Sequence, residues 1–355
     1  MAMLEVEDLN VRFYTEEGVV KATNDLSYQI EAGERFGVVG ESGAGKSVTS
    51  LAVMRLIDEP GVIESGSIRF KGRDLLDLSR EEMRSIRGDE IAMIFQDAGT
   101  ALNPAYTVGE QIAEAVRLHK GMDEDAARER TVELLESVGI PDPAARYDEY
   151  PHQFSGGMQQ RAVIAMALSC DPDLIIADEP TTALDVTIEA QILELLEDVA
   201  EEFDTAIQLI THDLGVIAEF CDRVMVMYAG RAVESAPVEN IYYDPKHPYT
   251  VGLMSSIPRI GDERDRLDTI PGRMPDLVEM PSGCTFHPRC PYAEESCARN
   301  EPPLVDVATG TPADPSAHSE HAAACLAHTG DLSGELDYTV TVEGEDPAIR
   351  GDGGE

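Results

Sequence analysis

The segment from Gly40 to Ser47 has the residue types and spacing of a loop that binds phosphate. It reads G-x4-G-K-S, follows an apolar run at residues 36–39 and leads into residues 48–57, whose apolar spacing is helical. In a strand, loop and helix of this kind, backbone N–H groups and the helix N-terminus favour phosphate. We therefore expect a nucleoside-triphosphate site, in which Lys46 contacts the β- and γ-phosphates and the Ser47 hydroxyl binds Mg²⁺. The nucleotide-binding residues expected from this loop are Gly40, Glu41, Ser42, Gly43, Ala44, Gly45, Lys46, Ser47 and Val48.

Two further apolar runs end in side chains suited to hydrolysis. Residues 174–177 lead into Asp178 and Glu179, and residues 206–211 lead into His212. The carboxyl ends of parallel strands meet at one edge of a sheet, where ligands bind. There Asp178 would hold Mg²⁺ through water, and Glu179 would polarise the attacking water as general base. His212 would contact the γ-phosphate and hold that water together with Glu179.

The composition restricts the class of protein. Acidic residues number 68 against 27 basic ones, only five of which are Lys, and the formal net charge is −41. Because the acids are scattered through the chain, we expect a halophilic protein, with an acidic mesophilic one as the alternative. Such a field repels phosphate backbones, so nucleic acid is not an expected partner. Apolar runs are shorter than the roughly 18 residues of a membrane span, and no export signal is recognisable, so we expect a cytoplasmic protein.

A further motif identifies the class of ATPase. Ser155, Gly156 and Gly157 open a helical pattern in "FSGGMQQRAVIAMAL", which resembles the signature sequence of ABC-type ATPases. The other motifs of that family occur in its usual order: Gln96 in "MIFQD" matches the Q-loop, Asp185 at the end of "TTALD" the D-loop, and His212 the H-loop.

The resemblance covers about residues 3–255 and implies a fold. That fold is an α/β P-loop NTPase of ABC type, with a parallel-sheet core, an antiparallel β part and a helical subdomain at about residues 98–160. It also implies that Gln96 joins Ser47 and Asp178 at Mg²⁺. Phe13 in "LNVRFYTEEG" is the expected partner of adenine, and Tyr14 is the alternative.

The same resemblance implies partners. In this family the signature, here Ser155, Gly156, Gly157 and Gln159, faces the ATP of a second subunit, so two ATPase subunits enclose two ATP molecules. We expect a heterodimer with a similar ATPase, on two membrane permease subunits served by an extracellular solute-binding protein. The chain would then lie peripherally at the cytoplasmic face of the cell membrane. The alternative class is a soluble ABC ATPase of DNA repair or translation, which the single ATPase domain and the negative charge disfavour.

Three segments narrow the resemblance to one group. "FQDAGTALNPAYTVGEQI" and "YPHQFSGGMQQR" look most like the ATPases of peptide importers and their nickel-importing relatives. Residues 244–258, "DPKHPYTVGLMSSIP", resemble the HPYT segment at the start of their C-terminal extension. The implied function is an ATP-hydrolysing subunit that energises import of dipeptides or oligopeptides, with nickel or another solute as the alternative.

Four of the six cysteines lie in a proline-rich region beyond the ATPase domain. Cys284, Cys290, Cys297 and Cys325 have the spacing C-x5-C-x6-C-x27-C. Zinc would normally show closer pairs, a reducing compartment disfavours disulfides, and irregular spacing on loops suits a [4Fe–4S] cluster, although spacing alone decides little. The segment resembles the extension of certain dipeptide-transporter ATPases, which implies an iron–sulfur cluster with a structural role; zinc and unligated thiols stay as alternatives. Substitute ligands would be His287, His318, His321 and His328, whereas Cys170 and Cys221 fit small buried hydrophobic residues.

The expected domain organisation follows from these motifs. Residues 3–255 form the ATPase domain, residues 256–328 a small loop-rich extension that binds metal, and residues 329–355 an acidic, flexible tail. Within the tail, "DYTVTV" at residues 337–342 favours one short strand.

Overall fold

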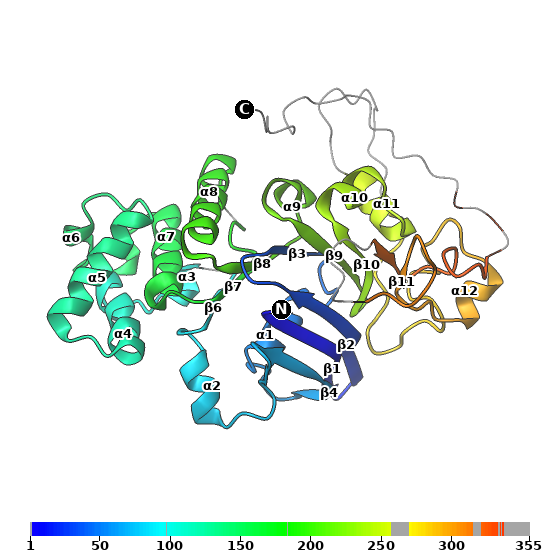
Figure 1. Ribbon diagram of the computed structural model, residues 1–355, viewed down its shortest axis with the longest axis horizontal. Coiled ribbons are helices and arrows are strands. Elements are labelled where there is room, and N and C mark those ends of the chain that lie inside the picture. Colours follow the sequence, from blue (N-terminus) through cyan, green and yellow to red (C-terminus); the bar gives the residue numbers. More distant parts are fainter. Residues whose placement is uncertain are drawn as a thin grey trace.

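A computed structural model describes residues 2–96, 98–182, 184–256, 270–314, 321–332, 334 and 336. An eight-stranded sheet runs through the centre of the molecule in the order β11-β12-β10-β9-β3-β8-β7-β6 (Figure 1). Its strands are β3 (Arg35–Val39), β6 (Ile91–Ile94), β7 (Leu174–Asp178), β8 (Ala206–Thr211), β9 (Arg223–Tyr228), β10 (Arg231–Pro237), β11 (Val305–Asp306) and β12 (Ala322–Ala323). Strands β6, β7, β8, β3 and β9 are parallel, which confirms the predicted parallel core.

The central strands are buried on both faces, as expected for continuous apolar runs in a parallel sheet. All residues of β7, β8 and β9 are buried. Alternate residues face opposite sides: Ile175 and Ala177 belong to one hydrophobic core, whereas Leu174 and Ile176 belong to the other. The sheet therefore divides the ATPase core into two hydrophobic layers and brings the carboxyl ends of its parallel strands to one edge.

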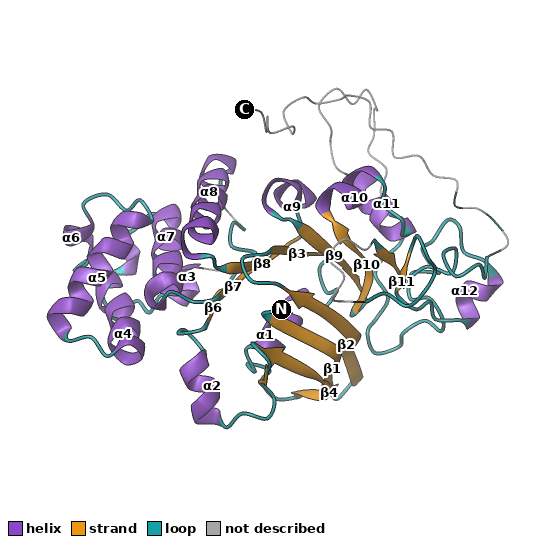
Figure 2. Ribbon diagram, in the orientation of Figure 1, coloured by secondary structure: helices purple, strands orange, loops and turns teal. Residues whose placement is uncertain are grey.

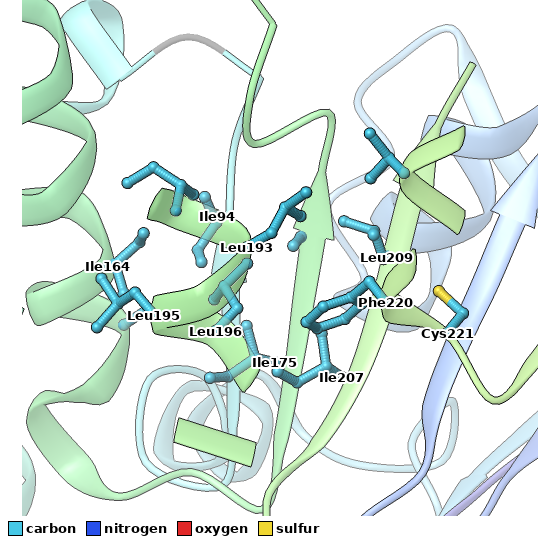
Figure 3. Close-up of a cluster of buried hydrophobic side chains, with 14 of the residues drawn as sticks. Ile94, Ile164, Ile175, Leu193, Leu195, Leu196, Ile207, Leu209, Phe220 and Cys221 are labelled. Carbon is cyan, nitrogen blue, oxygen red and sulfur yellow. The ribbon is translucent and has the colours of Figure 1, made fainter. Parts of the chain in front are cut away.

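The first layer is formed by helices on one face of the sheet. Helix α8 (Val186–Phe203) places Leu193 and Leu196 against Ile175 and Ile207 of the sheet (Figure 3). Helices α7 (Gly156–Ala167), α9 (Leu214–Phe220), α10 (Val238–Tyr243) and α11 (Pro248–Ser255) complete this layer.

The second layer lies between the central sheet and an antiparallel sheet, which Figure 2 shows below it. This sheet has the order β2-β1-β4-β5. Its strands are β1 (Leu4–Thr15), β2 (Gly18–Ile30), β4 (Gly61–Phe70) and β5 (Arg73–Asp74), and the helices on this side are α1 (Lys46–Val53) and α2 (Arg80–Ile86). The predicted antiparallel β part is thus confirmed.

The helical subdomain projects at one end of the molecule (Figure 1). It contains α3 (Ala98–Ala101), α4 (Val108–Lys120), α5 (Glu124–Ser137) and α6 (Pro143–Arg146) and leads into α7. Helices α4 and α5 are each capped at the N-terminus by a side chain. Thr107 accepts a hydrogen bond from Glu110 N (3.3 Å), and Asp123 accepts one from Ala126 N (2.9 Å). None of the described helices has the length and hydrophobicity that crossing a membrane requires.

The segment beyond residue 270 lies at the other end, beside β10 (Figure 1). It has one short helix, α12 (Glu295–Arg299), and the two-residue strands β11 and β12, so it is loop-rich as predicted. It does not depend on a core of its own, because Phe286 packs against Tyr228 (ring centroids 5.2 Å apart) and Tyr249 (5.4 Å) of the ATPase core. The predicted strand at residues 337–342 lies outside the described residues.

Candidate functional site

The loop between β3 and α1 has the conformation that its glycines allow. Gly40, Gly43 and Gly45 have φ angles of 156°, 83° and 101°. At Gly40 a Cβ would lie 2.2 Å from the carbonyl oxygen of Met227, and at Gly45 it would lie 2.3 Å from that of Ala22. Only glycine therefore lets the loop pass between β9 and β2 and turn its backbone inward.

Lys46 and Ser47 begin α1 directly behind this loop. The Lys46 ammonium group donates to the carbonyl oxygens of Gly40 (2.7 Å) and Glu41 (3.2 Å), so its side chain lies across the loop. The Ser47 hydroxyl donates to Asp178 Oδ1 over 3.1 Å, and Asp178 stands at the end of β7. A hydroxyl and a carboxylate so close together offer the oxygen ligands that Mg²⁺ prefers.

The charged groups at this point carry perturbed pKa values. Burial raises the pKa of Asp178, and the hydrogen bond from Ser47 only partly offsets this. Burial lowers the pKa of Lys46, against the nearby carboxylates of Glu179, Asp178 and Glu41. A divalent cation beside Asp178 would supply the positive charge that favours its ionised form.

The Glu179 carboxylate contacts residues of three sequence motifs. It accepts hydrogen bonds from Gln96 Nε2 (2.7 Å) and Thr182 Oγ1 (3.0 Å), and His212 Nδ1 lies 3.2 Å from Oε1. Burial alone would raise the pKa of Glu179, but the hydrogen bonds of His212 and Thr182 outweigh burial and lower it. The carboxylate is therefore ionised at neutral pH, as a general base must be. The side-chain amide of Gln96, which was expected beside Ser47 and Asp178 at Mg²⁺, thus donates its hydrogen bond to Glu179.

Thr182 was not singled out from the sequence, although its place three residues after Glu179 in "DEPTT" was a usable signal.

Two contacts of Glu41 in the phosphate-binding loop were also not predicted from the sequence. The Glu41 N–H donates to the hydroxyl of Tyr249 (2.9 Å), and the Glu41 carboxylate pairs with Arg289. Both partners stand far along the chain, and nothing near Glu41 indicates them.

The signature residues lie at the start of α7. Ser155 is the N-cap and accepts from Met158 N (3.4 Å), and Ser155 and Gly156 are exposed. Gln159 donates to the carbonyl oxygen of Pro151 (2.8 Å) and so fixes the loop before the helix. The exposed helix N-terminus is free to face an anion. Asp185, at the start of α8, is likewise an exposed N-cap, 3.0 Å from Ile188 N.

The two aromatic candidates for adenine lie next to each other on β1 and therefore point to opposite faces of the sheet. Phe13 is half-buried and packs near Gly61, where a Cβ would lie 2.6 Å from its ring. Tyr14 is 50% exposed, and its hydroxyl donates to Glu64 (2.9 Å). Phe13 as the adenine partner stays a prediction.

The four C-terminal cysteines surround one small pocket. Cys284, Cys290, Cys297 and Cys325 line it together with His247, Pro248, Phe286, His287, Tyr292, Leu326, Leu332 and Leu336. The backbone groups of Phe286 and His287 near Cys284, of Tyr292 near Cys290 and of Ala327 near Cys325 lower the pKa of those thiols and so oppose the effect of burial. In the described part of the chain, no three or more His, Cys, Asp or Glu side chains converge closely enough to hold a single metal ion.

Burial raises the pKa of three thiols in this pocket, those of Cys284, Cys290 and Cys325. The pKa of Cys290 rises to about 11 and that of Cys325 to about 12, and the neighbouring sulfurs contribute to both shifts. Among the substitute ligands, His287, His321 and His328 each have one ring nitrogen within hydrogen-bonding distance of another group, namely Cys284 O (2.8 Å), Glu234 (2.6 Å) and Lys246 O (3.0 Å). His318 lies outside the described residues. Cys170 and Cys221 are buried elsewhere, as predicted.

The parallel sheet, the loop at the start of α1 and the carboxylates at the ends of β7 define a P-loop ATPase. Comparisons with known proteins agree. A family model described as "ABC transporter" matches residues 23–182, and one described as "Oligopeptide/dipeptide transporter, C-terminal region" matches residues 233–297. The chain is 50% identical over 310 residues to the dipeptide transport ATP-binding protein DppD of Escherichia coli, which is 87% of this chain and 95% of that protein.

A second relative is the oligopeptide transport ATP-binding protein OppD of Salmonella typhimurium, 51% identical over 87% of this chain and 91% of that protein. The chain therefore belongs to the ABC transporter family, in the group of dipeptide and oligopeptide transport ATP-binding proteins. Among solved structures, the dimeric ATP-binding cassette MJ0796 in a post-hydrolysis state with ADP and Pi matches with a TM-score of 0.61 and 27% identity, over 66% of this chain and 99% of that one. The match supports the predicted ABC-type fold.

Proposed function

We propose that this chain is the ATP-hydrolysing subunit that energises import of dipeptides or oligopeptides through an ABC transporter. The observation that carries the proposal is the likeness to peptide-transport ATP-binding proteins along almost their whole length, C-terminal region included. Nickel or another solute is the alternative substrate. The alternative class, a soluble ATPase of repair or translation, has no support from these relatives.

The proposed reaction is hydrolysis of ATP to ADP and phosphate. In the bound nucleotide, the ring of Phe13 would stack on adenine. Residues 40–48 bind the phosphates, with Lys46 on the β- and γ-phosphates. Mg²⁺, held by Ser47, Asp178 and Gln96, would neutralise charge on the phosphates. Glu179 accepts the proton of the attacking water, and His212 keeps that water and the γ-phosphate in place. The hydrogen bonds that converge on Glu179 support this assignment, because they fix the orientation of an ionised base.

The proposal includes a second ATPase subunit. The signature, with Ser155 and Gly156 exposed and Gly157 partly buried, and the exposed Asp185 are the surfaces that would meet its ATP. Two membrane permeases and an extracellular binding protein complete the transporter, which places the chain at the cytoplasmic face of the membrane. The chain would then divide into an ATPase domain at residues 3–255, an extension at residues 256–328 and a tail at residues 329–355.

The proposal further assigns a [4Fe–4S] cluster to Cys284, Cys290, Cys297 and Cys325. Ligands of a single zinc ion converge on one point, whereas each iron of a cluster takes its own thiolate, so cluster ligands stand farther apart. Four cysteines around one apolar pocket, in a region where no three possible ligands of the described residues converge on one point, fit the cluster better than zinc. The cluster would fix the loops of the extension onto the ATPase core. The dispersed acidic charge supports a further element of the proposal, adaptation to concentrated salt.

Reconstitution tests the transport function. The chain, its partner ATPase and the two permeases are placed in vesicles with the binding protein, and phosphate release is measured. Dipeptide-loaded or oligopeptide-loaded binding protein should stimulate hydrolysis, whereas nickel-loaded binding protein should not. Stimulation by nickel alone, or stable association with ribosomes or DNA in place of permeases, would contradict the proposal.

A further inference from the structure

Arg289 of the extension forms an ion pair with Glu41 of the P-loop, across 248 positions of the sequence. Nη1 lies 2.9 Å from Oε2, and Nη2 lies 3.0 Å from Oε1, so the guanidinium and the carboxylate meet through two parallel bonds. The Arg289 side chain is 7% exposed and that of Glu41 is 29% exposed. This is a shielded, geometrically defined pair and not a mobile surface contact.

The rest of the Arg289 side chain is equally constrained. Its Nε donates to the carbonyl oxygen of Pro271 (2.8 Å), and Nη1 lies 3.4 Å from the hydroxyl of Tyr228. Its backbone N–H donates to Phe286 (3.0 Å), whose ring is fully buried in the ATPase core. The guanidinium is therefore held in place by both the extension and the sheet.

Glu41 in turn is connected to the whole phosphate-binding loop. Its N–H donates to Tyr249, and its carbonyl oxygen accepts from Ala44 N (3.1 Å) and Lys46 Nζ (3.2 Å). The pKa of Lys46 is lowered by burial, and the Glu41 carboxylate opposes this lowering together with those of Glu179 and Asp178. An anchored Glu41 thus helps to fix the loop, but its negative charge stands beside a site for the polyanion ATP.

The extension touches the same loop at another point. Met274 lies against Gly43, with its Cε 2.9 Å from the position that a Cβ would take there. Three residues on, the carbonyl oxygen of Leu277 accepts from Lys21 N on β2 (3.0 Å). The segment from residue 271 to residue 289 therefore contacts the P-loop at two points, Gly43 and Glu41, and is bonded to β2 between them.

We propose that Arg289 is a positioning residue for ATP: it neutralises Glu41 and holds the P-loop, so that the cysteine-bearing extension takes part in nucleotide binding. Without Arg289, the Glu41 carboxylate is left uncompensated next to the triphosphate, and repulsion at short range weakens binding. The role concerns charge, and it therefore makes a prediction that a purely structural role does not make. Removal of the Glu41 charge should restore binding to a chain that lacks Arg289.

The test measures the dissociation constant of Mg-ATP for the full chain, by competition with a fluorescent ATP analogue in high salt. Arg289→Ala should weaken binding about tenfold, and Arg289→Ala with Glu41→Gln should return to within about threefold of the native value. Arg289→Gln, similar in size, should behave like Arg289→Ala, whereas Arg289→Lys, which keeps the charge but not the two parallel bonds, should lose less affinity than Arg289→Gln. Arg299→Ala is the matched control, because Arg299 pairs with the exposed Glu295 of the same extension, and it should bind as native.

Three outcomes would overturn the inference. They are native affinity in Arg289→Ala, a double variant no better than the single one, and equal losses in the Lys and Gln variants. If Arg289→Ala does not fold, the Gln and Lys variants decide the question. Because the inference rests on the proposed nucleotide site, Lys46→Ala is measured alongside. Retained binding in Lys46→Ala would show that the site assignment fails, whereas its loss together with native binding in the Arg289 variants would refute only the role of Arg289.

Discussion

The side-chain amide of Gln96 lies 2.7 Å from the carboxylate of Glu179, although the two residues are 83 positions apart. Gln96 follows β6, at the start of the helical subdomain, and Glu179 follows β7. A shift of the helical subdomain relative to the sheet would therefore change a hydrogen bond on the proposed base. This gives a direct physical route by which movement at one end of the chain affects hydrolysis.

Replacement of Glu179 by Gln should separate hydrolysis from binding. The amide keeps the size of the side chain but cannot accept the proton of the attacking water, so phosphate release should fall by at least about 100-fold. ATP affinity should stay within about threefold of native, because the phosphates are held by the P-loop. Glu201→Gln, on the exposed face of α8, is the matched control and should hydrolyse ATP at the native rate. Unchanged hydrolysis in Glu179→Gln would remove this residue from catalysis.

Replacement of Cys290 by Ser should remove the proposed cluster. The native chain, purified without oxygen, should contain about four iron and four sulfide per chain, and the variant should lose most of both. Cys170→Ala, whose thiol is buried inside the ATPase core, serves as the control and should retain both. About one zinc per chain would keep a metal site but refute the cluster, and the absence of both metals would leave the four thiols unligated.

Stability should fall as the pH drops from about 6.5 to about 4, in part through His247. Burial lowers the pKa of this imidazole from 6.5 to about 4, against the attraction of Glu234, while His328 contributes to the lowering and the carbonyl oxygen of Ala324 opposes it. In this window the unfolded chain binds more protons than the folded one, so protonation favours unfolding. The contribution of His247 that is lost by pH 5 is about 2 kcal/mol.

The measurement is urea unfolding of the native chain and of His247→Asn at several pH values. Asn retains an N-cap acceptor for Tyr249 N, which His247 Nδ1 accepts over 3.1 Å, but it does not titrate. The free energy of unfolding of the variant should therefore depend less steeply on pH between about 6.5 and 5, even if the variant is less stable throughout. Identical slopes would show that His247 does not contribute.

Salt should stabilise the fold strongly. With a net charge of −41, the folded chain repels itself, and salt at about 1 M shortens the screening length to about 3 Å. The midpoint of thermal unfolding should therefore rise by more than about 10 °C between 0.1 M and 2 M KCl. Sorbitol at matched osmolality controls for effects other than screening and should raise the midpoint less. An equal midpoint of thermal unfolding in low and high KCl would contradict adaptation to salt and would favour the alternative of an acidic mesophilic protein.

The sequence predicts those parts of the site that depend on contacts between residues near in sequence or on the order of the parallel strands. The loop from Gly40 to Ser47 closes on itself through short-range contacts, and Asp178 and His212 follow strands whose parallel order sets their common edge. Glu179 and Gln96 could be placed near each other for the same reason. The contact between them is a finding of the structure, because the side-chain directions depend on packing.

The parts that sequence did not predict depend on distant segments. Neither the sequence around Arg289 nor that around Glu41 indicates the other, because an ion pair has no periodicity. The burial of Phe286 between Tyr228 and Tyr249 could not be foreseen either, since a lone aromatic residue in a proline-rich loop carries no pattern. The spacing of the four cysteines likewise left open whether all four reach one pocket.

Strand β12, only two residues long, has a consequence for how the ATPase domain behaves in isolation. Ala322 and Ala323 pair with Ser235 and Glu234 and so cover the backbone N–H and C=O groups along the open side of β10. A chain cut after residue 255 would leave that strand at the edge of the sheet and would uncover the aromatic rings beneath Phe286. Unpaired edges of this kind recruit strands from other molecules. We therefore expect a chain cut at this point to self-associate at β10, where the full chain does not.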